Sequence, residues 1–259
     1  MFGYFKRRRR QRVRSQPLPP AWGEILQRNV PYSRMLSAGE QEQLRGDALI
    51  LLDEKRFTGC GGLALTDEIR VTIAAGAAVL LLNRRTDYYP RMESIYVYPR
   101  EYFVRNVWHL PAHVEVEGDS RLGESWYRGP VVLSWDETLK GSLNPRDGRN
   151  VVYHEFAHQL DSENGEMDGT PPLADRRMVA EWAEVFTREF DRLADDVDRR
   201  RRTVIDEYGA TDPAEFFACA TEAFFERSGP LRSRHAELYN LLAQYYCQDP
   251  AARWSGRDG

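Results

Sequence analysis

The sequence has few cysteines and no long apolar segment. Its 259 residues include three cysteines, Cys60, Cys219 and Cys247, and no two of them form a Cys-x-x-Cys pair. This odd, unpaired set argues against a disulfide framework and is typical of a reducing compartment. The most apolar run, residues 73–82, has ten residues, whereas a membrane-spanning helix needs about 20. We therefore expect a cytoplasmic protein with no membrane contact.

The start of the chain is strongly basic. The first 14 residues carry seven basic side chains and no acidic one, so the other 245 residues carry a net charge of −11. A Pro-rich stretch follows, in place of the apolar run of a secretory signal. We expect residues 1–20 to form a disordered, solvated tail. Contact with nucleic acid or anionic lipid is the alternative, but nothing downstream supports it, so we expect no direct nucleic-acid binding.

Helical patterns dominate the rest of the chain, with strand-like stretches between them. Ser37 and Glu40 are spaced as a capping box at a helix start, and residues 69–82 predict a core helix. The expected strands are residues 95–98, 113–117 and 130–135. Strands in one block followed by a long helical half indicate an α+β fold, mainly helical with a small mixed sheet, rather than a doubly wound sheet.

One segment carries the pattern His-Glu-x-x-His. His154 and His158 lie one turn apart on the same face of a predicted helix, so both imidazoles can bind one Zn²⁺ at about 2.0–2.1 Å. Glu155 can act as general base towards a metal-activated water. Asn150 is the expected N-cap. Asp161 follows on nearly the same face and is expected to accept a hydrogen bond from a ligand imidazole.

The same five-residue pattern also occurs by chance in helices that bind no metal. Here its neighbours are apolar, which predicts a buried helix: Val151, Val152, Phe156, Ala157 and Leu160. Buried histidines need polar partners. We therefore favour a metal site over a helix that happens to carry two histidines.

A catalytic zinc usually has three protein ligands and one open position, so a third ligand is needed. Glu215 and Glu222 lie seven residues apart on one face of a helix that is expected to begin after Asp212. Glu215 fits a capping box equally well, and Glu222 fits a salt bridge or a supporting contact, so spacing does not decide between them. Weaker candidates occupy loop or exposed positions: Glu163, Glu166, Asp168 and Glu181.

Two segments of the chain resemble the Mlc titration factor A family. They are His-Glu-Phe-Ala-His-Gln-Leu-Asp and, with its glutamate 57 residues after the second histidine, Thr-Asp-Pro-Ala-Glu-Phe-Phe-Ala. Residues 128–135 and 150–152 add to the resemblance, which extends in layout over about residues 20–250. Members of this family are bacterial zinc metallopeptidases related to the protease domain of anthrax lethal factor. The resemblance thus implies a zincin-like domain with one Zn²⁺ per chain.

The resemblance also assigns roles to individual residues. It implies that Glu215 is the third ligand and that Tyr208 stabilises the oxyanion; the alternative for Tyr208 is packing at a helix end. Lethal-factor-type enzymes have an acidic residue one turn after the ligand, where this chain has Cys219. We expect Glu222 to supply the supporting contact instead.

The domain and function expected from this resemblance are specific. A single metallopeptidase domain would cover residues 21–250, with a helical part over about 21–90 and a catalytic part over about 91–250. Its activity would be aminopeptidase-like hydrolysis of peptide or protein substrates, with a regulatory role through binding an Mlc-like repressor of the sugar phosphotransferase system. The alternative is a non-catalytic zinc protein that sequesters a repressor. The intact Glu155 favours the enzyme, because a structural zinc site needs no general base.

Overall fold

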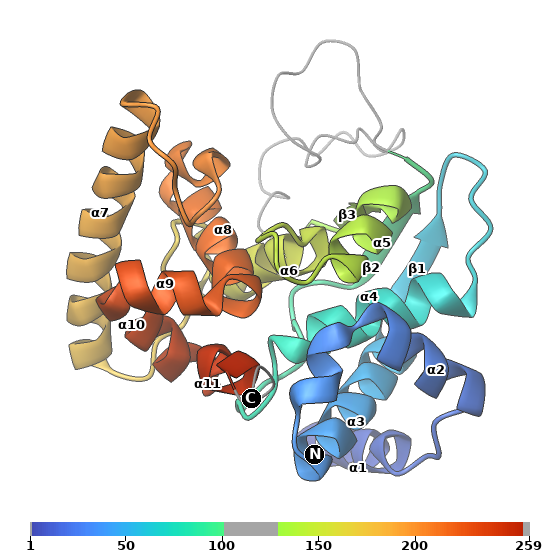
Figure 1. Ribbon diagram of the computed structural model, residues 1–259. Coiled ribbons are helices and arrows are strands. Elements are labelled where there is room, and N and C mark those ends of the chain that lie inside the picture. Colours follow the sequence, from blue (N-terminus) through green and yellow to red (C-terminus); the bar gives the residue numbers. More distant parts are fainter. Residues whose placement is uncertain (1, 101–128, 256–259) are drawn as a thin grey trace, which may run out of the picture. The chain divides into compact units, whose positions relative to one another are not determined.

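The computed structural model describes residues 2–100 and 129–255 (Figure 1). The strand expected at residues 113–117 lies outside this described part. The chain divides into two compact units, unit 1 over Met1–Leu143 and unit 2 over Asn144–Gly259. The boundary between these units falls after residue 143, and the expected division near residue 90 stays a prediction. A single domain over residues 21–250 stays a prediction.

The described residues of unit 1 form helices and a small sheet. Its helical elements are α1 (Phe2–Arg14), α2 (Pro20–Asn29), the 3₁₀ helix η1 (Pro31–Met35), α3 (Ala38–Glu54), α4 (Asp67–Val79) and α5 (Trp135–Leu143). The expected capping box starts α3, because Ser37 and Glu40 exchange side-chain and backbone hydrogen bonds. The predicted core helix is α4, which packs against α2 and α3. Among the described residues, no helix is both long and apolar enough to cross a membrane.

The first residues form helix α1, so the prediction of a disordered tail is wrong for residues 2–14. α1 packs against α3. Arg10 lies 2.7 Å from Glu54, and Arg14 pairs with Asp47, whose side chain is almost fully buried. Val13 is buried as well. These partners lie 33 to 44 residues away in sequence, so the basic composition of the segment does not reveal them.

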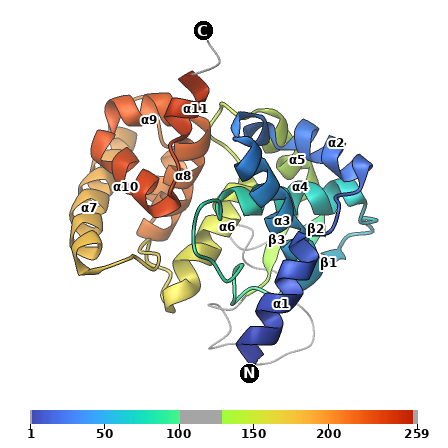
Figure 2. The same cartoon turned by 90° about the horizontal axis from the view of Figure 1, so that it is seen from below.

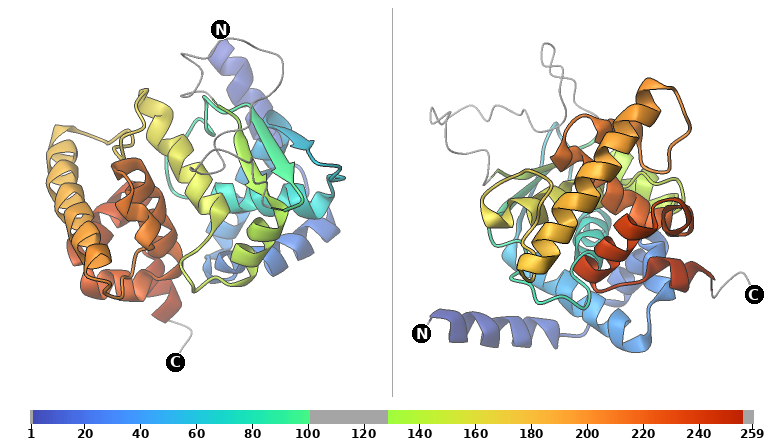
Figure 3. Two further views of the ribbon diagram at one scale, coloured as in Figure 1. Left: turned by 90° about the horizontal axis from the view of Figure 1, so that it is seen from above. Right: turned by 90° about the vertical axis from the view of Figure 1, so that its left-hand side faces the viewer.

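The sheet has three described strands, β1 (Arg56–Gly59), β2 (Ser94–Tyr98) and β3 (Val131–Ser134), in the order β1-β2-β3. Both pairings are parallel, so the described sheet is parallel and not mixed as predicted. The reason is the connection: α4 joins β1 to β2 as a helical crossover (Figure 3), which parallel neighbours require.

Unit 2 is helical throughout its described residues. Its elements are α6 (Val151–Asp161), η3 (Ser162–Asn164), α7 (Arg176–Asp198), η4 (Glu207–Ala210), α8 (Pro213–Glu226), α9 (Ser228–Arg234), α10 (Ala236–Tyr246) and α11 (Pro250–Ser255). α8 is buried along its whole length from Ala214 to Glu226 and packs against α6 and η4 (Figure 2). Aromatic side chains of α7, including Trp182 stacked 4.0 Å from Phe186, pack against Phe217 of α8.

The starts of α6 and α8 are fixed by side-chain caps at the predicted residues. The Asn150 side chain accepts a hydrogen bond from the Tyr153 N–H at 3.2 Å, and the Asp212 side chain accepts one from the Glu215 N–H at 3.0 Å. Gly165 follows the short η3 turn in the left-handed conformation, with a φ of +106°. The caps set where each later side chain of α6 and α8 points.

Candidate metal centre

α6 and α8 bring three predicted ligands to one point. His154 and His158 occupy successive turns of α6, and their Nε2 atoms lie 3.2 Å apart. Glu215, in the first turn of α8, places its Oε2 atom 3.0 Å from His154 Nε2 and 3.4 Å from His158 Nε2. These three side chains form one of two groups among the described residues that could hold a metal ion.

The chemistry of these atoms fits a bound cation. The Glu222 carboxylate contacts His154 Nδ1 at 2.8 Å, so the proton of the neutral ring belongs on Nδ1 and Nε2 presents a lone pair. Glu215 Oε2 is buried and has no hydrogen-bond donor among the described residues. Lone pairs that face one another repel unless a cation lies between them. In a tetrahedral zinc site the ligand atoms are about 3.4 Å apart, close to the observed separations.

The protonation of two carboxylates suits this site. Burial raises the pKa of Glu215, but the neighbouring imidazoles of His154 and His158 outweigh the effect of burial and lower that pKa to about 2. Glu215 is therefore ionised at neutral pH, as a metal ligand must be. Burial raises the pKa of Glu155, which brings this carboxylate closer to the range in which a group both accepts and returns a proton.

Sequence comparison identifies the family. The sequence model of the family described as glucose-regulated metallo-peptidase M90 matches residues 5–247. The chain belongs to this family. The uncharacterized protein slr2042 of Synechocystis sp. is 40% identical over 244 residues, which cover 93% of this chain and 89% of that protein. Mlc titration factor A of Yersinia pestis is 33% identical over 236 residues, which cover 90% of this chain and 86% of that protein. The resemblance predicted from the motifs is confirmed.

Behind His154 in this M90 chain lies a buried polar network. One oxygen of Glu222 contacts the imidazole, and the other accepts a hydrogen bond from the backbone N–H of Asn150. The Asn150 side-chain amide donates to Glu226 at 2.9 Å. Sequence analysis identified Asn150 only as a cap and did not single out Glu226. Glu226 lies four residues after Glu222 and therefore on the same face of α8. That spacing was the sequence signal that could have identified Glu226.

Cys219 belongs to a second possible ligand group in the M90 chain, together with His154 and Glu222. It is buried in α8, one turn after Glu215. Burial raises the pKa of the Cys219 thiol to about 11, so the thiol keeps its proton at neutral pH. In this second group Glu222 contacts His154 through Nδ1, the nitrogen that carries the proton and is not free for a metal, so the group with Glu215 is the better site.

Tyr208 and Asp161 occupy different surroundings in the M90 chain. The centre of the Tyr208 ring, on η4, lies 6.2 Å from the centre of the His154 ring. Burial and the charge of Glu215 raise the pKa of Tyr208, so its hydroxyl stays protonated.

Asp161 accepts a hydrogen bond from the Gly169 N–H at 2.8 Å. Within the described residues, the other Asp161 oxygen and His158 Nδ1 have no hydrogen-bond partner. The predicted contact of Asp161 with a ligand imidazole therefore stays a prediction.

The weaker acidic candidates belong to neither ligand group of the described residues: Glu163, Glu166, Asp168 and Glu181.

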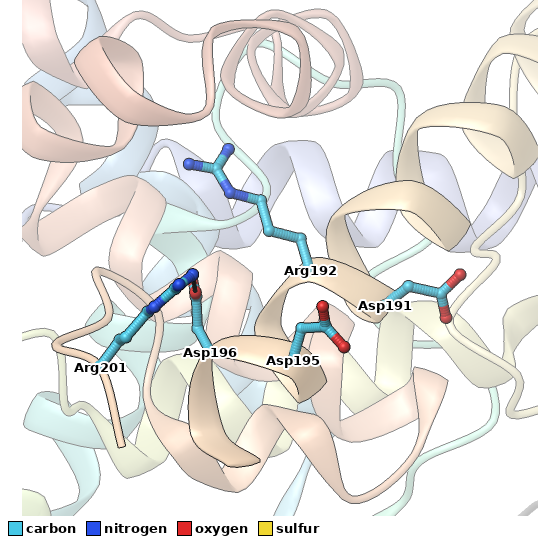
Figure 4. A pocket seen from close by; sticks show the side chains of 5 residues that line it. All are labelled: Asp191, Arg192, Asp195, Asp196 and Arg201. Carbon is cyan, nitrogen blue, oxygen red and sulfur yellow. Dashed lines mark hydrogen bonds and ion pairs between the residues drawn. The ribbon is translucent and has the colours of Figure 1, made fainter. Parts of the chain in front are cut away.

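A surface pocket of about 400 Å³ in unit 2 is lined by charged residues of α7 and the following loop (Figure 4): Asp191, Arg192, Asp195, Asp196 and Arg201. Arg201 points to Asp196 in this pocket and pairs with it at 3.1 Å. None of the predicted site residues lines it, so the candidate centre of this M90 chain is the cluster on α6 and α8.

Proposed function

We propose that this chain is a zinc-dependent, aminopeptidase-like peptidase with a zincin-like fold. The observation that carries the proposal is the convergence of His154 Nε2, His158 Nε2 and Glu215 Oε2, with Glu155 next to the first ligand. Three protein ligands leave one coordination position open, as in catalytic zinc sites. The description of the family as metallo-peptidases supports the same activity.

One Zn²⁺ per chain, when bound, supplies a Lewis acid that polarises the substrate carbonyl and lowers the pKa of a water molecule. Glu155 accepts the proton of the attacking water and passes it to the leaving amine. The protonated hydroxyl of Tyr208 donates a hydrogen bond to the developing oxyanion. Glu222 keeps the Nδ1 atom of His154 protonated and its Nε2 atom free for the metal, and Asp161 is assigned to the support of His158.

The experiment is hydrolysis of a panel of short amide substrates by the zinc-loaded protein, with the zinc content measured for each variant. We expect Glu155→Gln to keep one zinc and to lose about 10²–10⁴-fold in kcat, since the general base is removed. Glu166→Gln, which changes an exposed carboxylate in the loop after α6, is the matched control and should keep the parental rate. If parent and Glu155→Gln both bind zinc and neither cleaves any substrate, the peptidase proposal is wrong.

A second candidate function is the binding of a transcriptional repressor. It is favoured by the relatives named Mlc titration factor A, which are 33% identical over 90% of this chain. In this proposal the chain binds an Mlc-like repressor of the sugar phosphotransferase system in the cytoplasm. The test is retention of a purified repressor of that type on the immobilised parent and on Glu155→Gln. Equal retention by both would show binding that is independent of catalysis, and retention by neither would contradict it.

A further inference from the structure

Helix α1 is attached to unit 1 through one of its faces. Three of its cations recur every four residues and therefore share that face: Lys6, Arg10 and Arg14. Their acidic partners are Asp87, Glu54 and Asp47. The buried Val13 lies on the same side. Ion pairs and an apolar contact thus hold this face of α1 against the rest of unit 1. The opposite face of α1 takes no part in these contacts.

The opposite face of α1 is exposed and contains no acidic residue. At 100° per residue, Tyr4, Phe5, Arg8 and Arg12 lie on this outward face, and Arg7 lies at its margin. The two aromatic side chains are 65% and 62% exposed. Arg7, Arg8 and Arg12 are exposed and make no ion pair with any described residue. The N-terminal part of α1 also extends beyond the other helices of unit 1 (Figures 2 and 3).

We propose that the outward face of α1 binds the surface of an anionic lipid membrane. The three unpaired guanidinium groups contact lipid phosphates, and the rings of Tyr4 and Phe5 enter the interfacial layer, where aromatic side chains partition. The helix stays attached to unit 1 through its other face, so the contact requires no unfolding. With three unpaired cations and two rings, the association is peripheral, reversible and sensitive to salt. This inference replaces the expectation of no membrane contact and is independent of the peptidase proposal.

The geometry of α1 favours lipid over single-stranded nucleic acid. The rings of Tyr4 and Phe5 meet edge to face, with an interplanar angle of 77°, so they form no parallel platform on which successive bases stack. The outward face belongs to a single convex helix, whereas single-stranded nucleic acid is bound along a charged groove. A bilayer surface is flat on this scale and needs no groove.

The test is co-sedimentation of the full chain with vesicles. We expect binding to phosphatidylcholine vesicles that contain about 30% phosphatidylglycerol to exceed binding to pure phosphatidylcholine about fivefold or more, and to disappear at about 0.5 M salt. The triple variant Arg7→Gln, Arg8→Gln, Arg12→Gln should lose this preference. The double variant Tyr4→Ala, Phe5→Ala should bind more weakly at every salt concentration at which the parent binds. These side chains are exposed, so circular dichroism should show the parental helix content.

The matched control removes three exposed cations elsewhere: Arg177→Gln, Arg200→Gln and Arg202→Gln. It should bind anionic vesicles like the parent. Equal loss in both triple variants would overturn the proposal, because binding would then follow net charge alone. Equal binding to both vesicle types, or to neither, would also overturn it. Binding of a labelled single-stranded oligonucleotide without vesicle binding would assign the outward face to nucleic acid instead.

Discussion

At the scale of single residues, Glu222 determines which nitrogen of His154 is available to a metal. Its carboxylate accepts the hydrogen bond of His154 Nδ1, and an amide at this position is a weaker acceptor. We expect Glu222→Gln to lower zinc affinity about 10–100-fold with the fold retained. Competition with a chromophoric chelator measures the affinity. Glu237→Gln, at an exposed position of α10, is the control, and parental affinity in Glu222→Gln would contradict the positioning role.

Asp161 should make the stability of the metal-free protein depend on pH. Burial raises its pKa from 3.8 to about 6, so the folded state favours the protonated carboxyl. The protonated Asp161 carboxyl contributes fully to the free energy of unfolding below about pH 4. This contribution is lost as the pH rises through about 6, and the loss is about 3 kcal/mol at most. Asp161→Asn removes this group. Between about pH 4 and pH 7, the free energy of unfolding measured with denaturant should therefore change less with pH for the variant than for the parent. An identical pH dependence in both proteins would show that Asp161 is not the group responsible.

Two of the candidate ligands could be predicted from local spacing, and the third could not. His154 and His158 are neighbours on one helix, so their separation follows from helix geometry alone. The choice between Glu215 and Glu222 depends on how α8 is rotated and shifted against α6. In the structure both carboxylates contact His154, but Glu215 also lies within 3.4 Å of His158. That difference arises from tertiary packing, which spacing along one segment does not contain.

At the scale of elements, local signals predicted helix starts and missed long-range pairing. The caps at Ser37, Asn150 and Asp212 are all present, because each is complete within a few residues. α1 is an ordered helix because it pairs with acidic residues that lie far along the chain, such as Asp47. The parallel direction of the strands depends on the path of α4. Neither follows from composition or from the pattern of one strand.

Gly169 links three helices, and a side chain there should destabilise unit 2. Its N–H donates to Asp161 of α6, and its carbonyl accepts from Trp182 of α7. Its φ is +78°, and an added Cβ would lie 2.3 Å from the carbonyl oxygen of Pro213 in α8. We expect Gly169→Ala to lower the free energy of unfolding by about 2 kcal/mol or more, measured by denaturant unfolding. Gly229→Ala, where nothing lies within 4 Å of the added Cβ, should match or slightly exceed parental stability; equal effects of the two changes would contradict this account.

At the scale of the whole molecule, the two units differ in charge and in proposed role. Residues 1–143 contain 21 basic and 17 acidic side chains, and residues 144–259 contain 15 and 23. The outward face of α1 belongs to the first unit, and every proposed metal ligand belongs to the second. A membrane contact and a metal centre therefore use separate parts of the chain, and variants of one should leave the other unchanged.

Metal binding should stabilise the whole protein. The proposed ligands come from α6 and α8, which must lie together for the ion to bind, so zinc favours the folded state by about 4 kcal/mol at a free concentration of about a thousand times Kd. A chelator should therefore lower the unfolding temperature, and added zinc should restore it. Glu155→Gln should keep this shift because Glu155 is not a ligand, and His158→Ala should lose it. A shift that survives His158→Ala would refute the ligand set, and one lost in Glu155→Gln would place Glu155 among the ligands.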